Sequence, residues 1–280
     1  MLRGVLGFVA AWLAVTTMAS AQTTVERGRY LVETIVGCGN CHTPKGPQGD
    51  LPNMALAGGF VIDEQPFTAV APNITPDTET GIGKWTDDQI FLAIREGKRP
   101  DGSLIGPPMP FFFYRGLADD DVRAMVAYLR TVKPIKNAVT QKSVYRMPLP
   151  PNWGPSVGAI KAPPRSDTLA YGAYLAGPMG HCLDCHTPLK PDNMFDLTKM
   201  GAGGRAFPGP WGTSVSANIT PLGLGDWKDA EVERAIRTGV SKDGHKLFPP
   251  MAFTYYAGIS KDDMAALITY LRTLPPTRPN

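Results

Sequence analysis

The sequence predicts an all-α protein made of two tandem helical domains, residues 22–132 and 167–280, which a Pro-rich linker at 133–166 joins. The first observation behind this prediction is an internal repeat. Asn73-Ile74-Thr75-Pro76 recurs at 218–221, and Tyr128-Leu129-Arg130-Thr131 recurs at 270–273. Matching segments lie 142 to 145 positions apart, so the second half of the chain is a duplicate of the first. The second observation is that the repeated segments carry apolar residues at helical spacing, flanked by helix caps.

Residues 1–21 are expected to be a secretory signal peptide. Arg3 is the only charge before Val25, an apolar run extends from Val5 to Val15, and Ala19-Ser20-Ala21 is a small-x-small cleavage site. The apolar run is short for a membrane span, which leaves an uncleaved anchor as the minority alternative.

Each domain is expected to contain three helices. The first ends in a cysteine motif and has Tyr30-Leu31, or Tyr174-Leu175 in the repeat, on its apolar face. The second begins at the Thr86-Asp87-Asp88 cap and stops at Gly97, and its counterpart runs from 227 to Gly239. The third spans 118–132, with its repeat at 261–274. The Gly/Pro/Asn-rich stretch between the first two is predicted to be mostly loop. The linker is expected to be extended and to lie against a domain surface, because it contains Tyr145, Met147 and Trp153.

All four cysteines belong to two Cys-x-x-Cys-His motifs, Cys38 to His42 and Cys182 to His186, with the other thiols at Cys41 and Cys185. This is the attachment pattern of c-type haem. Two thiols on one helical turn can reach the vinyl groups on one porphyrin edge, and the histidine that follows binds the iron. A lone Cys-x-x-Cys would also fit a redox dithiol or a zinc knuckle, and a scaffold with two metal knuckles is the remote alternative. Two copies, each followed by histidine, predict two covalently bound haem c groups with His42 and His186 as proximal ligands.

The distal iron ligands are predicted to be Met109 and Met251. The first domain has no histidine besides His42, and methionine is the usual alternative sixth ligand. Met109 and Met251 match under the repeat, and each follows two prolines that hold it on a stiff segment. In the second domain His245 has no histidine partner, and His181 directly precedes the cysteine motif, where it cannot reach the far face of the porphyrin. Filling a gap in a loop is the alternative role for such a methionine.

Asn73 and Asn218, together with Trp85 and Trp227, are candidate hydrogen-bond donors to the haem propionates. Turn formation by the asparagines and core packing by the tryptophans are equally consistent with the sequence. Arg95 and its repeat partner Arg237 are more simply explained as solvent-facing than as propionate partners. The formal net charge of +3 gives no indication of nucleic-acid binding.

The repeated motifs resemble those of the cytochrome c subunits of bacterial periplasmic dehydrogenases, of the quinohaemoprotein alcohol and gluconate types. The resemblance is carried by Ala71-Pro72-Asn73-Ile74-Thr75-Pro76, Thr80-Gly81-Ile82-Gly83, Trp85-Thr86, Ala93-Ile94-Arg95, Gly97 and Pro107-Pro108-Met109-Pro110. It implies class I cytochrome c domains that take electrons from a catalytic subunit. The attachment cysteines carry over onto Cys38, Cys41, Cys182 and Cys185, and the axial ligands onto His42, Met109, His186 and Met251. Subunits of this kind commonly have three haems and a membrane attachment, whereas this chain has two motifs.

These observations predict a periplasmic dihaem cytochrome c, not an enzyme, because His/Met-ligated iron has no open position for a substrate. The expected electron donor is the catalytic subunit of a periplasmic dehydrogenase, and the expected acceptor is a small cytochrome or a terminal oxidase. Membrane contact is expected to be peripheral at most. The alternative is a dihaem enzyme, such as a peroxidase or a thiosulfate-oxidising cytochrome, which would need an accessible or unusually ligated iron.

Overall fold

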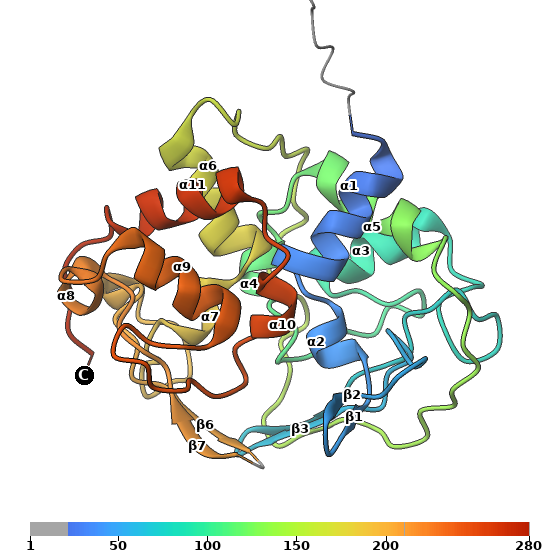
Figure 1. The fold of residues 1–280 in the computed structure, drawn as a ribbon. Helices are drawn as coiled ribbons and strands as arrows, with labels where there is room; N and C mark the ends of the chain where they lie inside the picture. Colours follow the sequence, from blue (N-terminus) through green and yellow to red (C-terminus); the bar gives the residue numbers. More distant parts are fainter. Residues whose placement is uncertain (1–21, 210, 280) are drawn as a thin grey trace, which may run out of the picture.

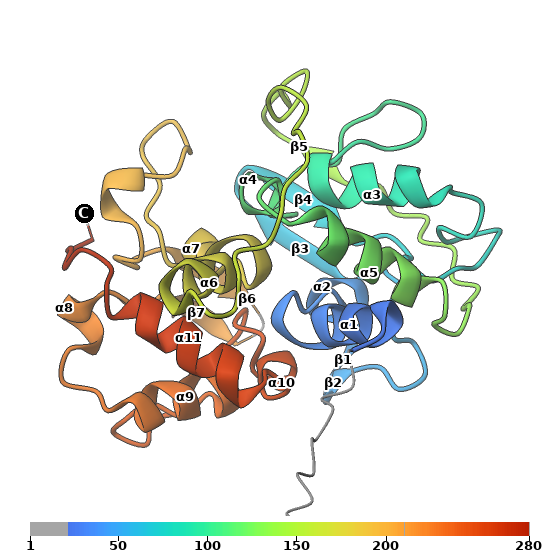
Figure 2. The same ribbon diagram turned by 90° about the horizontal axis from the view of Figure 1, so that it is seen from above.

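The computed structural model describes residues 22–209 and 211–279; the expected signal peptide lies outside them. The first half of the chain (blue to green) and the second half (yellow to red) lie side by side in both views of Figures 1 and 2. The first half and the linker contain α1 (Thr24–Tyr30), η1 (Leu31–Ile35), α2 (Gly39–His42), β1 (Lys45–Gly46), β2 (Gly49–Asp50), β3 (Val61–Glu64), β4 (Phe67–Val70), α3 (Asp87–Glu96), α4 (Phe111–Tyr114), α5 (Asp119–Leu129) and β5 (Val144–Tyr145).

The second half repeats this series with small changes. It contains α6 (Thr168–Tyr174), η2 (Leu175–Met179), α7 (Cys182–Cys185), η3 (Leu197–Lys199), β6 (Ala206–Gly209), β7 (Gly212–Val215), α8 (Pro221–Leu224), α9 (Asp229–Thr238), α10 (Phe253–Tyr256) and α11 (Lys261–Leu271). The elements η1 and η2 are single π-helical turns, which the sequence analysis did not predict; each continues the first helix of its half toward the cysteine motif.

The predicted second helices are confirmed by α3 and α9. Thr86 caps α3 through a capping box with Gln89, and both helices end at a glycine in the left-handed conformation, Gly97 at φ 64° and Gly239 at φ 66°. The third helices end three residues earlier than predicted. The hydroxyl groups of Thr131 and Thr273 each donate a 2.7 Å hydrogen bond to the carbonyl three residues before them, and so occupy an acceptor at the end of the helix.

The prediction of an all-α fold is wrong, because the described residues form three small antiparallel sheets. One is the β1–β2 pair, one has the order β3–β4–β5, and one is the β6–β7 hairpin. The strands have only two or four residues, which is too short for a reliable alternating pattern. In addition, β5 belongs to the linker and pairs Tyr145 with Phe67, a contact between distant segments that local sequence does not specify.

Close helix crossings build the core of each half. Helix α1 packs along α5, and α6 packs along α11 (Figure 2). Glycine is required at both crossings: a Cβ at Gly28 would collide with the Ala124 carbonyl, and a Cβ at Gly172 with the Ala266 carbonyl. The apolar side chains of both halves belong to one continuous core.

A reciprocal pair of tyrosines joins the two halves. The Tyr30 hydroxyl donates to Asp263 at 2.7 Å and accepts from the Ser260 amide at 3.2 Å. Its repeat partner, the buried Tyr174, donates to Asp121 at 2.7 Å and accepts from the Ala118 amide at 2.9 Å. Each tyrosine thus binds the start of the other half's last helix, so the two halves exchange equivalent contacts.

The linker lies against the first half, as predicted from its aromatic residues. Trp153 stacks on Phe111 with ring centroids 5.8 Å apart and donates to the Ile105 carbonyl at 3.0 Å. The side chain of Arg95, only 4% exposed, forms an ion pair with Asp119 and donates to the Gly158 carbonyl at 3.2 Å. Arg95 is therefore a buried partner of the linker and does not face water, contrary to the simpler sequence interpretation.

Asp119→Asn is expected to release the linker from the first half. The Ile160 amide, which donates to the carboxylate at 3.0 Å, and then the Arg95 guanidinium lower the pKa of Asp119. Losing the charge beside a buried arginine should reduce the free energy of unfolding by about 1–3 kcal/mol. Because the folded-state pKa is the lower one, this stabilisation is complete above the unfolded value near 3.9 and is lost as the pH falls through the folded value.

The measurement is the rate of tryptic cleavage after Lys161, which is exposed in the linker. Asp119→Asn should accelerate cleavage, whereas Asp120→Asn, at the exposed neighbouring carboxylate, should not. Equal rates for both variants and the unaltered protein would show that Asp119 does not hold the linker.

Candidate functional site

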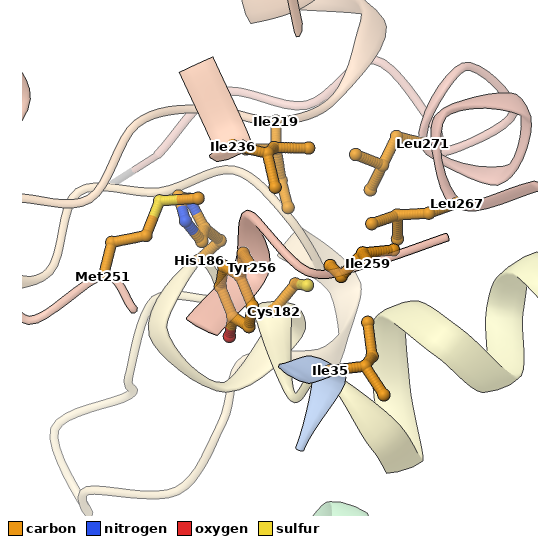
Figure 3. A pocket seen from close by; sticks show the side chains of 10 residues that line it. All are labelled: Ile35, Cys182, His186, Ile219, Ile236, Met251, Tyr256, Ile259, Leu267 and Leu271. Carbon is orange, nitrogen blue, oxygen red and sulfur yellow. The ribbon is translucent and has the colours of Figure 1, made fainter. Parts of the chain in front are cut away.

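The predicted haem ligands of the second half line one apolar cavity. Cys182, His186 and Met251 all border it (Figure 3). Cys182 is the first residue of α7, His186 caps the end of α7, and Met251 lies in the loop before α10. The other lining side chains are almost entirely aliphatic: Ile35, Ile219, Ile236, Tyr256, Ile259, Leu267 and Leu271. A nitrogen ligand, a thioether and a thiol around an apolar space are the groups that a c-type haem requires.

The orientation of each predicted proximal histidine is fixed by a backbone carbonyl. His42 Nδ1 lies 2.9 Å from the Pro72 oxygen, and His186 Nδ1 lies 2.6 Å from the Ala217 oxygen. Since a carbonyl only accepts, Nδ1 must carry the hydrogen in both rings, and Nε2 keeps the lone pair that binds a metal. Burial lowers the pKa of both histidines, which favours this neutral form.

The thiols do not have the properties of a redox-active dithiol. Burial raises the pKa of Cys38 and of Cys182 to about 12, whereas a reactive Cys-x-x-Cys pair has a lowered thiol pKa. Within residues 22–209 and 211–279, no group of three or more His, Cys, Asp or Glu side chains is arranged to hold a metal ion.

The first half carries a corresponding set of side chains. The second-half residues of the cavity have repeat partners at Cys38, His42, Ile74, Ile94, Met109, Tyr114, Leu117, Met125 and Leu129. Cys38, Ile74 and Met109 pack against the hydrophobic core that contains the last four. Met125 corresponds to the cavity residue Leu267, and both are at most 1% exposed, which agrees with a packing role for Met125.

The two cysteine motifs are close to each other. The hydroxyl group of Tyr256 donates to the Gly180 carbonyl at 3.0 Å, beside the second motif, and the neighbouring Tyr255 packs against Gly39 of the first motif. Ile35, from the first half, lines the cavity of the second. The Ile35 Cδ1 methyl group would be 3.3 Å from a Cβ at Gly180, which lies two residues before Cys182 in the sequence. A residue from one half thus completes the cavity of the other.

The two asparagines among the candidate propionate donors have other partners. Asn73 accepts from the Thr75 amide at 2.9 Å and donates to Thr80 and to the Ile135 carbonyl, so both amide hydrogens are in use. Asn218 accepts from Thr220 and donates to the Thr277 carbonyl at 2.6 Å. Trp85 and Trp227 are half-buried against the core. A propionate contact stays a prediction for these residues; the structure gives the asparagines a turn-forming role.

Sequence reasoning missed three contributors to the site. These are the carbonyl groups of Pro72 and Ala217, Tyr256, and Ile35. The aromatic run that ends at Tyr114 is expected from the sequence to pack around the haem, and the repeat could have indicated Tyr256 as well, because it matches Tyr114 at an offset of 142. A backbone carbonyl carries no sequence signal of its own, although both precede the repeated asparagine.

Comparison with known proteins identifies similar cytochromes. The cytochrome c family matches residues 25–133. The chain is 33% identical to the fructose dehydrogenase cytochrome subunit of Gluconobacter japonicus, over 92% of this chain and 54% of that protein. It is 30% identical to the gluconate 2-dehydrogenase cytochrome c subunit of Pantoea cypripedii, over 98% of this chain and 65% of that protein. A dihaem c-type cytochrome of Cereibacter sphaeroides is 30% identical over 85% of this chain and 82% of its own length.

These relatives are cytochrome subunits or dihaem cytochromes and not catalytic subunits, which confirms the prediction that this chain is an electron-transfer component. The chain spans about half the length of the fructose dehydrogenase cytochrome subunit. Within the described ranges, no helix has the length and apolar character needed to cross a membrane.

Proposed function

Because this chain belongs to the c-type cytochromes, in which haem is covalently attached, we propose that it binds two haem c groups and relays electrons between them. The observation that carries the proposal is the cavity shared by Cys182, His186 and Met251, together with the matching set in the first half. Each half, 22–132 and 167–280, would then be a haem-binding domain, with 133–166 as the linker. The repeated order of elements supports these boundaries.

Haem c, when bound, supplies an iron that gains or loses one electron. The residues of the chain hold and shield it. The cysteine pairs would attach the haem, the Pro72 and Ala217 carbonyls orient the histidines that would bind its iron, and the methionines would supply the other iron ligand. The aliphatic lining excludes water, which disfavours the extra charge of the ferric state. Thioether ligation acts in the same direction, so both reduction potentials should be positive on the hydrogen scale.

The catalytic subunit of a periplasmic dehydrogenase is the electron donor that we propose. Support comes from relatives whose names are those of cytochrome subunits of fructose and gluconate dehydrogenases. A small cytochrome or a terminal oxidase is the acceptor consistent with a positive potential. Residues 1–21 would export the chain to the periplasm, where such a relay operates.

The reduced protein is expected to bind carbon monoxide slowly and to show little peroxidase activity, because two six-coordinate irons leave no open position. Stopped-flow mixing of the dithionite-reduced protein with carbon monoxide measures this, with absorbance followed at the haem Soret band. Neither haem should react within the mixing time. Fast binding of one molecule of carbon monoxide per protein would mean that one iron has an open position, and would favour the dihaem enzyme instead.

A further inference from the structure

The segment that contains Met251 contacts the cysteine motif of the first half. Asn40, between Cys38 and Cys41, donates from its side-chain nitrogen to the carbonyl of Pro250 at 3.2 Å. Pro250 directly precedes Met251. The first contact therefore joins the attachment motif of the first haem to the backbone that presents the distal ligand of the second.

A second contact holds the same segment just after the methionine. Tyr255, in α10, lies on Gly39, where a Cβ would collide with the tyrosine hydroxyl. That hydroxyl donates to Asp50 of β2 at 2.7 Å. Met251 is thus placed between two anchors, Pro250 and Tyr255, and both anchors bind the first half of the chain.

The opposite pairing exists for Met109. Tyr114, five residues after this methionine, makes an edge contact with the ring of His181 at a centroid distance of 5.7 Å, and His181 directly precedes Cys182. Gly116 approaches Pro178 of η2 so closely that a Cβ would be 2.9 Å from the proline ring. The segment that follows Met109 in the first half therefore packs against the segment that precedes Cys182 in the second half.

We infer that each distal methionine is positioned by the attachment segment of the other haem, with Asn40 as a positioning residue for Met251. This inference rests on the proposed assignment of Met109 and Met251 as iron ligands. Its physical consequence is that a change in one attachment motif weakens methionine ligation at the other iron. If each half worked independently, a substitution at Asn40 would affect only the haem that is attached beside it.

Asn40→Ala in the Met109→Ala background tests the inference in the full-length protein with both haems. In that background the near-infrared charge-transfer band between methionine and ferric iron comes from Met251 alone. Added imidazole competes for the sixth position, and the loss of the band reports its affinity. Removing the hydrogen bond to Pro250 should raise the affinity for imidazole about fivefold, the factor expected for one hydrogen bond.

The matched control is Asn40→Ala in the Met251→Ala background, where only Met109 reports and the affinity for imidazole should not change. An unchanged affinity in the first background, or an equal change in both, would overturn the inference. If the Asn40→Ala protein does not attach both haems, Tyr255→Phe, which removes the hydrogen bond to Asp50, takes its place. In the Met109→Ala background, Tyr255→Phe must then raise the affinity for imidazole. Failure of the ligand assignment is recognised separately, because Met109→Ala and Met251→Ala alone would then each keep the full band.

Discussion

Replacing Met251 with alanine is expected to remove about half of the near-infrared band between methionine and ferric iron, and replacing Met109 as well should abolish it. The reason is that, under the proposed assignment, each half contributes one thioether, and Met251 borders the same cavity as His186. Loss of the thioether also favours the ferric state. The reduction potential of the affected haem should fall by the order of 0.1 V, a fraction of the roughly 0.8 V that axial ligation spans.

Met125→Leu is the matched control for ligation. Met125 is 1% exposed, and its repeat partner is Leu267, so this substitution gives the first half the residue that the second half already has. The variant should keep the full band and both potentials. If Met109→Ala and Met251→Ala each retained full intensity, neither methionine would be a ligand, and the relay with two His/Met irons would have to be abandoned.

Cys182→Ala combined with Cys185→Ala is expected to reduce the covalent haem content from two per chain to one. These thiols belong to one motif, and the described residues place the other pair, Cys38 and Cys41, in the equivalent position of the first half. The cavity of the second half would lose the group that its aliphatic side chains are suited to contact. The free energy of unfolding should fall by more than about 4 kcal/mol, as when a bound metal or cross-link is lost.

The pyridine haemochrome spectrum, divided by the protein concentration, measures the haem content, and the mass of the denatured chain shows which haem stays attached. The converse variant, Cys38→Ala with Cys41→Ala, should also keep one haem. One haem per chain in the unaltered protein, or two haems per chain in either double variant, would contradict the assignment of one haem to each motif.

Local sequence was sufficient for the features that depend on neighbouring residues. The Thr86 cap, the Gly97 and Gly239 helix ends and the two Cys-x-x-Cys-His motifs could be identified because each involves only a few adjacent positions. The repeat extended this reasoning by showing which methionines match, which no single segment could show. The three sheets were missed, since strands of two to four residues have no dependable pattern and β5, in the linker, pairs with β4, which is far from it in the sequence.

The sequence by itself determined the two attachment motifs, the duplicated order of helices and the choice of Met109 and Met251 as candidate ligands, because all of these are properties of residue type and spacing. Only the tertiary structure decided how the halves meet. The contacts of Tyr30 with Asp263, and of Asn40 with Pro250, join residues more than 200 positions apart. Such contacts depend on the packing of complete helices against each other, and the residues that form them are unremarkable in their own segments.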